Sequence, residues 1–260
     1  MHYLDYAATT PVPAPVAEVM VKVLTEDFGN PSAQYPLGRA ARDLVEESRA
    51  AVAEALGCKS QQLLFTSCGT ESDNWAIRAA LWQNRRVGKH IVATAVEHSA
   101  VLQCLKALEQ EGYEVTLVKP DSTGCITAEQ MAAALREDTA LVSMMLVNNE
   151  TGVRFPVEEV AALLKDRPTL LHTDAIQGFL KVPFTAAALG ADLIALSGHK
   201  VGAPKGIGAL YVGGKMKNPR PLLYGGGQES GLRPGTEPVA QMAGFAEAVR
   251  RQKATMAEDT

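Results

Sequence analysis

Short, nearly continuous hydrophobic runs along the chain are separated by amphipathic stretches of helical length. The runs predicted to be strands are Gln62–Thr66, His90–Ala95, Glu114–Lys119, Ala140–Val147, Thr169–His172, Leu193–Leu196 and Ala209–Val212. The stretches predicted to be helices are Gly38–Leu56, Thr70–Arg86, Ser99–Glu111, Ala128–Arg136, Val157–Lys165 and Pro238–Lys253. This alternation predicts a three-layer α/β fold, in which helices cover both faces of a seven-stranded, mostly parallel sheet.

The last predicted strand differs from the others in how it is connected. Only the loop Val201–Gly208 separates it from its predecessor, and this loop is too short for a helical crossover, so we expect an antiparallel pairing there. Residues 1–15 are expected to form an N-terminal arm, 16–253 one large domain and 254–260 a frayed tail. The chain contains no internal repeat and no low-complexity tract.

Composition and charge remove several classes of function. The chain has 260 residues, of which 47% are hydrophobic and 21% charged, as is ordinary for a globular protein. Its net charge is -4 and its pI is about 5.8, which gives no electrostatic basis for binding nucleic acid. No apolar run reaches the roughly 20 residues that span a bilayer, and no basic segment precedes an apolar one at the N-terminus. These features predict a cytoplasmic protein.

The spacing of the cysteines argues against a metal site. Cys58, Cys68, Cys104 and Cys125 form no C-x-x-C pair, so no zinc or iron–sulfur centre is expected and the residues are predicted to be free thiols. Cys58 and Cys125 lie in predicted turns, whereas Cys104 lies in a helical pattern and is expected in the core.

Polar or ionisable residues follow five of the predicted strands. The segments are Ser67–Ser72, Glu97–Ser99, Asn148–Gly152, Thr173–Gln177 and Ser197–Lys200. In an open parallel sheet, ligands bind at the carboxyl ends of the strands. Turn chemistry explains any one of these segments, but it explains the histidine and lysine placements poorly. We therefore predict a ligand site at this edge of the sheet.

Lys200 and Asp174 provide an amine at one predicted strand end and a carboxylate at another. This pair suits pyridoxal phosphate, because a lysine forms the Schiff base and an acid holds the proton of the ring nitrogen. Two simpler interpretations stay open: a lysine on the solvated surface, and an aspartate that caps the turn beginning at Ala175. Lys205 is the rival lysine, but it lies inside the loop rather than at the strand end.

Small residues at Ser67–Thr70 precede a predicted helix and indicate a phosphate site, because free N–H groups and the helix dipole meet there. The alternative is an ordinary N-cap formed by Thr70. His98 follows another strand and could stack on an aromatic ring or move protons, although a core histidine fits the same pattern.

The motifs together resemble the cysteine desulfurases, the NifS/IscS-like group of the class V aminotransferase superfamily, which have the pyridoxal-phosphate-dependent fold of type I. The matching segments are Tyr3–Pro11, Phe28–Ser32, Phe65–Asn74, Val96–His98, Val147–Gly152, His172–Gln177, Ser197–Lys200 and Gly225–Glu237. They occur in the order of the family and extend over nearly the whole chain.

The resemblance implies a role for each residue of the site. Lys200 carries pyridoxal 5'-phosphate and shuttles protons, and His98 stacks on its ring and acts as an acid or base. Asp174 pairs with the ring nitrogen, Gln177 bonds the ring hydroxyl, and Asn149 lies near both the ring hydroxyl and the substrate carboxylate. The implied phosphate ligands are Gly69, Thr70, Ser197 and His199, joined by Thr236 from the partner subunit of a homodimer.

The resemblance also implies an activity. L-cysteine is converted to L-alanine, and the sulfur passes through a cysteine thiolate to an acceptor or scaffold protein, as in iron–sulfur cluster assembly. Family members continue past Thr260 and place the sulfur-accepting cysteine, a carboxylate-binding arginine and a small domain there. Cys68 replaces a usual glycine and is expected to be packed. The 260 residues are therefore expected to hold the cofactor and to turn over cysteine poorly. Alternatives are a class V aminotransferase, a cysteine or selenocysteine lyase, and a truncated non-catalytic scaffold.

Overall fold

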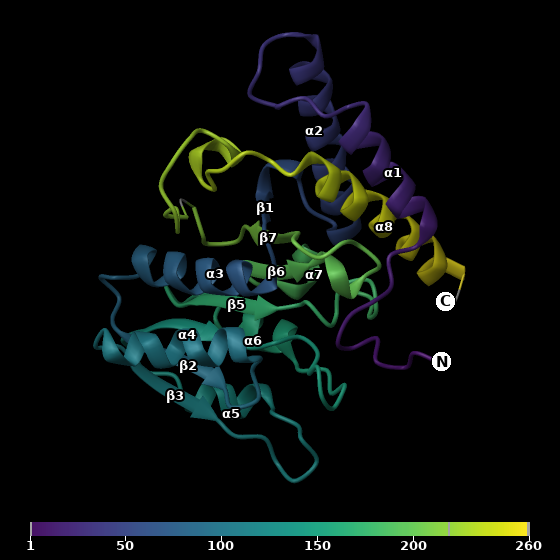
Figure 1. Cartoon of the computed structure of the whole chain (residues 1–260). Coiled ribbons are helices and arrows are strands. Elements are labelled where there is room, and N and C mark those ends of the chain that lie inside the picture. The colour runs from purple at the N-terminus through teal and green to yellow at the C-terminus, as the bar shows by residue number, and fades with distance from the viewer. Residues whose placement is uncertain (1, 218, 259–260) are drawn as a thin grey trace.

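Among residues 2–217 and 219–258, which the computed structural model describes, seven strands form one sheet (Figure 1). The strands are β1 (Leu63–Thr66), β2 (His90–Thr94), β3 (Glu114–Val118), β4 (Thr139–Ser143), β5 (Leu170–Asp174), β6 (Leu193–Ser197) and β7 (Gly208–Val212). Their order across the sheet is β1-β7-β6-β5-β4-β2-β3.

Helices surround this sheet. They are α1 (Ala14–Thr25), α2 (Pro36–Leu56), α3 (Gly69–Gln83), α4 (Ser99–Gln110), α5 (Ala128–Ala133), α6 (Val157–Leu163), α7 (Ala186–Leu189) and α8 (Val239–Glu258), with short 3-10 turns η1 (Ser60–Gln62), η2 (Gly198–Lys200) and η3 (Glu229–Gly231). The pattern of α4 illustrates why the helices form and bury one face, because its buried residues recur at helical spacing. They are Ala100, Val101, Cys104, Leu105 and Leu108.

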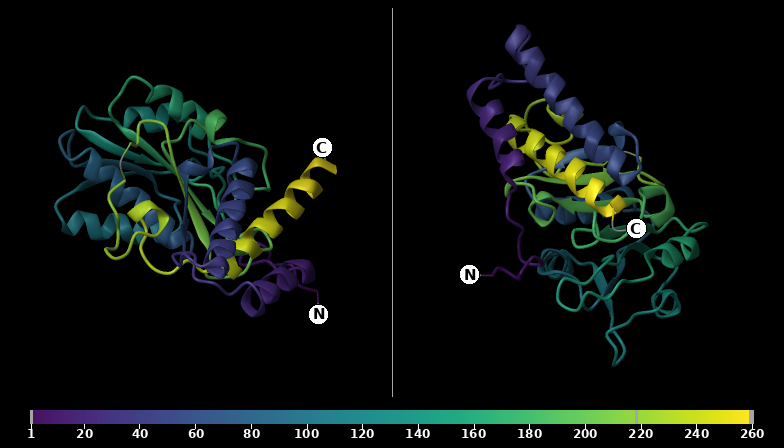
Figure 2. Two further views of the ribbon diagram at one scale, coloured as in Figure 1. Left: turned by 90° about the horizontal axis from the view of Figure 1, so that it is seen from above. Right: turned by 90° about the vertical axis from the view of Figure 1, so that its right-hand side faces the viewer.

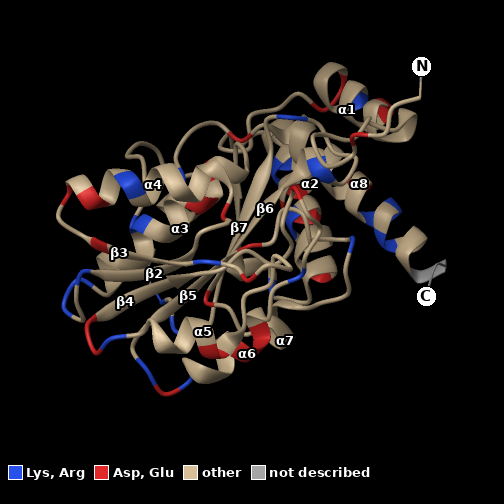
Figure 3. Cartoon of the chain, turned by 90° about the horizontal axis from the view of Figure 1, so that it is seen from below, with Lys and Arg blue, Asp and Glu red and all other residues tan. Residues whose placement is uncertain are grey.

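Alternate side chains along β1 and β7 enter two separate hydrophobic clusters, one on each face of the sheet. In β1, Leu63 and Phe65 belong to the cluster that includes Val52 of α2, whereas Leu64 belongs to the cluster of Trp75 in α3. Figure 3 shows α3 and α4 on one face and α5, α6 and α7 on the other. The predicted three-layer arrangement is therefore confirmed for the described residues.

One strand, β7, is antiparallel to both of its neighbours, yet the carboxyl ends of the other strands still lie at one common edge of the sheet. β7 runs antiparallel to β6, as predicted, and also to β1, while the other described pairs are parallel. Gly208, where β7 begins, lies opposite both Thr66 and Ser197, where β1 and β6 end. The carboxyl ends of β1 and β6 consequently meet at the same edge as those of the parallel strands.

The structure corrects one predicted strand. The strand predicted over Ala140–Val147 ends as β4 at Ser143, although the backbone continues beside β5, where Met144 donates to the His172 carbonyl at 3.1 Å. The N–H of Met145 instead donates to the Glu97 side chain at 2.8 Å, which removes it from the strand ladder.

Several helices also differ from the predictions: α3, α5 and α6 end two or three residues early, and the short helix α7 was not foreseen. α1 begins at Ala14, inside the stretch predicted as an arm, and was not foreseen. α8 continues past the predicted end at Lys253 to Glu258, so most of the predicted tail is helical, and residues 259–260 lie outside the described residues.

α1, α2 and α8 form a separate group beside the β1 end of the sheet, and α8 packs against the other two (Figures 1 and 2). α8 also supports the loop that follows η2, because a Cβ placed on Gly244 would lie 3.3 Å from the Pro204 Cδ atom. Within the described part of the chain, no helix combines the length and apolar character needed to cross a membrane. Basic and acidic residues are mixed along the chain in Figure 3.

Candidate active site

A cavity of about 410 Å³ lies at the edge where the strands end. Its lining includes the arm residues Asp5, Ala7 and Ala8, together with Cys68, Gly69, Thr70, His98, Met145, Asn149, Glu150, Asp174, Ile176, Gln177, Ser197, His199 and Lys200. The predicted edge site is therefore present as a cavity. Lys205, the rival lysine, is exposed and does not line it.

Lys200 ends the turn η2, directly after β6. The turn depends on Gly198, because a Cβ there would lie 2.7 Å from Ile207 Cγ2. The Lys200 amine donates to the carbonyls of Ala7 at 2.5 Å and Ala8 at 2.8 Å. Desolvation lowers the pKa of this amine, while the charge of Asp174 opposes that shift. The lysine is thus directed into the cavity rather than into bulk solvent.

Asp174 ends β5, beside β6, and only 4% of it is exposed. Its Oδ1 accepts a hydrogen bond from the Ile176 N–H at 2.9 Å, so the turn-capping interpretation is also correct. Burial raises the pKa of Asp174 to about 8, and the charge of Lys200 opposes this rise. The carboxyl therefore favours its ionised form only when a cation reaches it from the cavity.

The first turn of α3 opens on the cavity. Its N-cap, Cys68, makes no side-chain capping bond, so Thr70 is not the cap and that alternative is wrong. Gly69 packs closely against Ile176, because a Cβ at this position would lie 2.2 Å from Ile176 Cδ1 and would displace the end of that side chain. Free N–H groups at a helix N-terminus bind anions. The hydroxyls of Thr70 and Ser197 line the same cavity and add donors.

His98 is exposed to the cavity and is not a core residue, which excludes that interpretation. The residue is the N-cap of α4, and its Nδ1 accepts from the Ala100 N–H at 3.1 Å. Nε2 is therefore the ring nitrogen that can carry the proton. Desolvation and then the charge of Lys200 lower the pKa of His98, so the ring favours its neutral form.

Gln177 connects the cavity to a second lysine that the sequence motifs did not single out. Its Nε2 donates to the Ala7 carbonyl at 2.8 Å, and its Oε1 accepts from Lys181 at 2.6 Å. Leu180, directly before Lys181, has a φ of 55°, which is uncommon for a bulky residue and fixes this turn. Lys181 thereby sets which end of the Gln177 amide is presented to the cavity.

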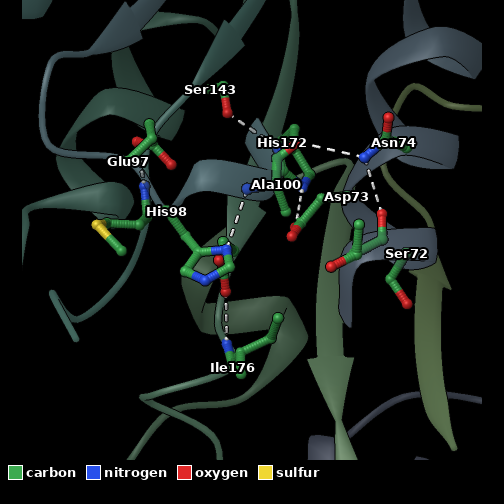
Figure 4. Close-up of polar contacts among 12 residues, drawn as sticks. Ser72, Asp73, Asn74, Glu97, His98, Ala100, Ser143, His172 and Ile176 are labelled. Carbon is green, nitrogen blue, oxygen red and sulfur yellow. Dashed lines mark hydrogen bonds and ion pairs between the residues drawn. The ribbon is translucent and has the colours of Figure 1, made fainter. Parts of the chain in front are cut away.

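Asp73, Glu97 and His172, labelled in Figure 4, are buried ionisable side chains close enough to Asp174 to interact with its charge, and none of them was assigned a role from the sequence. Asp73 of α3 and His172 of β5 are wholly buried, and Asp73 Oδ1 lies 3.4 Å from His172 Nε2. Glu97 accepts from Thr94 at 2.6 Å, and burial raises its pKa to about 7. The sequence did contain a signal for Asp73: it lies on the same face of α3 as the apolar residues Ala76, Ile77 and Ala80, which are buried.

The raised pKa of Asp174 predicts how the stability of the cofactor-free chain changes with pH. The carboxyl has a pKa of about 4 in an unfolded chain and about 8 in the fold. Its contribution to stability is therefore complete below about pH 4 and is lost as the pH rises through about 8. We expect urea denaturation to show the free energy of unfolding falling, relative to Asp174→Asn, between about pH 5 and about pH 8. A difference independent of pH would contradict this.

The donor set fits pyridoxal phosphate. The uncapped first turn of α3, with Ser197 and His199, matches the needs of a phosphate. Asp174, whose burial disfavours its charge, matches a protonated ring nitrogen, and the Lys200 amine matches the aldehyde. Thr236, assigned to the partner's site, is exposed in its own chain and lies outside this cavity. In the described part of the chain, no group of His, Cys, Asp and Glu could hold a metal ion.

Comparison with known proteins gives consistent results. The pattern of the aminotransferase class-V family matches residues 2–259. Cysteine desulfurase IscS of Methanosarcina thermophila is 42% identical over 256 residues, which are 98% of this chain and 63% of that relative. A solved NifS-like protein superposes with a TM-score of 0.94 at 39% identity, over 98% of this chain and 70% of that one. SspA in complex with cysteine gives 0.91 at 37% identity, over 96% and 72%.

The sheet order, the lysine after β6 and the buried aspartate at the end of β5 define the large domain of fold type I, the architecture of many pyridoxal-phosphate-dependent enzymes. The resemblance to the cysteine desulfurases that the motifs indicated is confirmed by the sequence and structural matches. The chain belongs to the aminotransferase class-V family, whose enzymes use pyridoxal phosphate.

Proposed function

We propose that this chain is the cofactor-binding large domain of a cysteine desulfurase, which holds pyridoxal 5'-phosphate and takes L-cysteine as its substrate. One observation carries the proposal: the Lys200 amine, the Asp174 carboxyl and the open first turn of α3 face one cavity. Cysteine is the ligand in the structure of the related SspA. The chain spans 63% of the length of its IscS relative, which is why the activity of the whole protein is part of the proposal.

The side chains of the cavity have distinct tasks in this proposal. Pyridoxal phosphate, when bound, withdraws electrons from the amino-acid carbon and makes its hydrogen acidic. Asp174 keeps the ring nitrogen protonated, and Gln177, oriented by Lys181, donates to the ring hydroxyl oxygen. Lys200, whose amine has a lowered pKa, holds the cofactor and then accepts and returns a proton. His98 covers the ring, and its Nε2 can exchange a proton with the substrate.

The thiol that accepts sulfur is proposed to lie outside these 260 residues. Burial raises the pKa of both Cys58 and Cys104 to about 11, so neither supplies a thiolate at neutral pH. Cys125 is exposed but does not line the cavity. Cys68 lines it, although it lies beside the first turn of α3, where we place the phosphate.

The proposed assembly is a homodimer in which Thr236 reaches the cavity of the second copy. Its exposure, outside the cavity of its own chain, supports this arrangement. A sulfur-acceptor or scaffold protein would then take the sulfur from the complete enzyme.

The test begins with the chain itself. After incubation with pyridoxal phosphate, borohydride reduction and peptide mapping, we expect the label on Lys200, and the same result in a Lys205→Ala control. With L-cysteine, persulfide formation by the 260 residues is expected to be on the order of a hundredfold or more below that of a complete relative, because the nucleophile is absent.

Other outcomes would identify the alternative functions. Alanine and sulfide without a persulfide would indicate a lyase, and amino transfer to a keto acid an aminotransferase. A chain that takes up no cofactor would be a scaffold, and the proposal would then be wrong.

A further inference from the structure

The pairing of Asp73 with His172 is the least expected feature of the interior. Both side chains are wholly buried, and their nearest charged atoms, Asp73 Oδ1 and His172 Nε2, are 3.4 Å apart. Neither oxygen of Asp73 has a hydrogen-bond partner among the described residues, and neither does His172 Nε2. On the other side of the ring, Nδ1 lies 2.9 Å from the Ser143 hydroxyl (Figure 4). A buried carboxyl and imidazole with no other partners have to satisfy one another.

The charges around Asp73 decide which of the two groups holds the proton. The titratable groups that face it are Glu97 after β2, Cys104 on α4, and His172 and Asp174 on β5, with Lys200 beyond Asp174 on the cavity side. Burial, followed by the Glu97 charge, raises the pKa of Asp73 well above its usual range. Burial also lowers the pKa of His172. Both directions favour a neutral acid beside a neutral imidazole.

We infer that Asp73 keeps its proton and donates it in a hydrogen bond to His172 Nε2, while the Nδ1–H of the ring donates to Ser143. Asp73, His172 and Ser143 then form an uncharged chain that fixes one tautomer of the imidazole. Because His172 and Asp174 lie two residues apart on β5, they point to the same face of the sheet. These three hydrogen-bonded side chains therefore lie directly behind the Asp174 carboxyl, which faces the cavity.

The absence of charge on Asp73 and His172 has a consequence for Asp174, and this step rests on the proposed function. An ionised Asp73 would repel the charge on Asp174 and favour its protonated form. An uncharged Asp73 leaves Asp174 free to ionise when a cationic ring nitrogen arrives. Asp73 is thus a positioning residue that acts through His172 and Asp174 without touching the cofactor.

The decisive experiment uses the full chain without cofactor, so that it can be read even if pyridoxal phosphate does not bind. Asp73→Asn keeps the shape and a donor toward His172 but has no proton to lose. The infrared difference spectrum between wild type and Asp73→Asn at neutral pH is expected to show loss of a protonated-carboxyl C=O band. A difference containing only carboxylate bands would overturn the inference.

The imidazole gives a second readout that a purely structural role would not move. Nitrogen-15 NMR is expected to show His172 neutral, protonated on Nδ1, in both wild type and Asp73→Asn. Asp73→Leu, of similar size but with no donor, is expected to release the ring into a mixture of tautomers. A doubly protonated His172 in the wild type would overturn the inference. If Asp73→Leu does not fold, the comparison with Asp73→Asn still decides the matter.

Cofactor affinity gives the functional readout. Since Asp73 carries no charge, Asp73→Asn is expected to keep the dissociation constant of pyridoxal phosphate within about threefold of the wild type. A change in this dissociation constant of about tenfold or more, equivalent to one pKa unit, would mean that Asp73 is charged in the wild type and would overturn the inference.

Discussion

Replacing Lys200 with alanine is expected to abolish covalent retention of pyridoxal phosphate and, with it, the visible absorption band of the loaded chain. The amine donates to the arm carbonyls of Ala7 and Ala8 inside the cavity, and desolvation lowers its pKa, which favours the neutral, nucleophilic form relative to an ordinary lysine. No other lysine lines this cavity among the described residues. We expect the cofactor retained after dialysis to fall on the order of a hundredfold, because only non-covalent contacts remain.

Two matched variants show whether this loss is specific. Lys205→Ala removes an exposed lysine five positions along the same segment and is expected to leave the band unchanged. Lys181→Ala is expected to keep the covalent bond but alter the band, since Gln177 loses the group that orients its amide. Retention of the band in Lys200→Ala would reject the proposed role of this lysine and would direct attention to Lys181.

Replacing Glu229 with alanine is expected to lower the free energy of unfolding by about 3–5 kcal/mol, because the buried Arg49 guanidinium loses its two shortest bonds and keeps only the Leu63 carbonyl and the exposed Glu46. Glu229, in η3, holds two elements that lie far before it in the sequence, α2 and β1. Its oxygens accept from Arg49 of α2 at 2.6 and 2.8 Å, and from the Phe65 N–H of β1 at 2.9 Å. Only 2% of the Glu229 side chain and 10% of the Arg49 side chain are exposed, so water from the adjoining cavity replaces the lost bonds only in part.

An exposed ion pair of the same chemistry provides the control. Arg78 and Glu111 are 2.8 Å apart, with 36% and 48% of their side chains exposed. Glu111→Ala is expected to change stability by less than about 1 kcal/mol. Urea denaturation of both variants measures the contrast. Equal effects would show that burial of the Arg49–Glu229 pair does not govern its contribution.

The general architecture could be predicted from the sequence because both signals for it are local. Continuous apolar runs require a sheet covered on both faces, and the short loop before β7 requires a reversal of direction. α1 was missed because it begins beside Pro13, in a segment that packs against α8, far along the chain. β4 was predicted too long because a side chain, Glu97, captures the N–H of Met145. Such long-range contacts leave no periodic signal.

The candidate site was predictable to the extent that it follows from strand ends. Lys200, Asp174 and His98 come directly after β6, at the end of β5 and after β2, so the topology alone brings them together. Asp73 was not predictable in the same way, because a single carboxylate in a helix pattern normally marks a solvated face. The contribution of the N-terminal arm was also missed, since backbone carbonyls receive the Lys200 amine and backbone atoms carry no sequence signature.

α8 packs against the loop that follows Lys200, residues 201–207, and this contact affects when the cofactor site is complete during synthesis. Val201, Ala203 and Ile207 share a hydrophobic cluster with Phe245 and Ala248 of α8. A nascent chain that has released β7 from the ribosome has every strand of the sheet, yet lacks the helix that covers this loop. Binding of pyridoxal phosphate is therefore expected to follow the emergence of α8 from the ribosome tunnel, and not merely completion of the sheet.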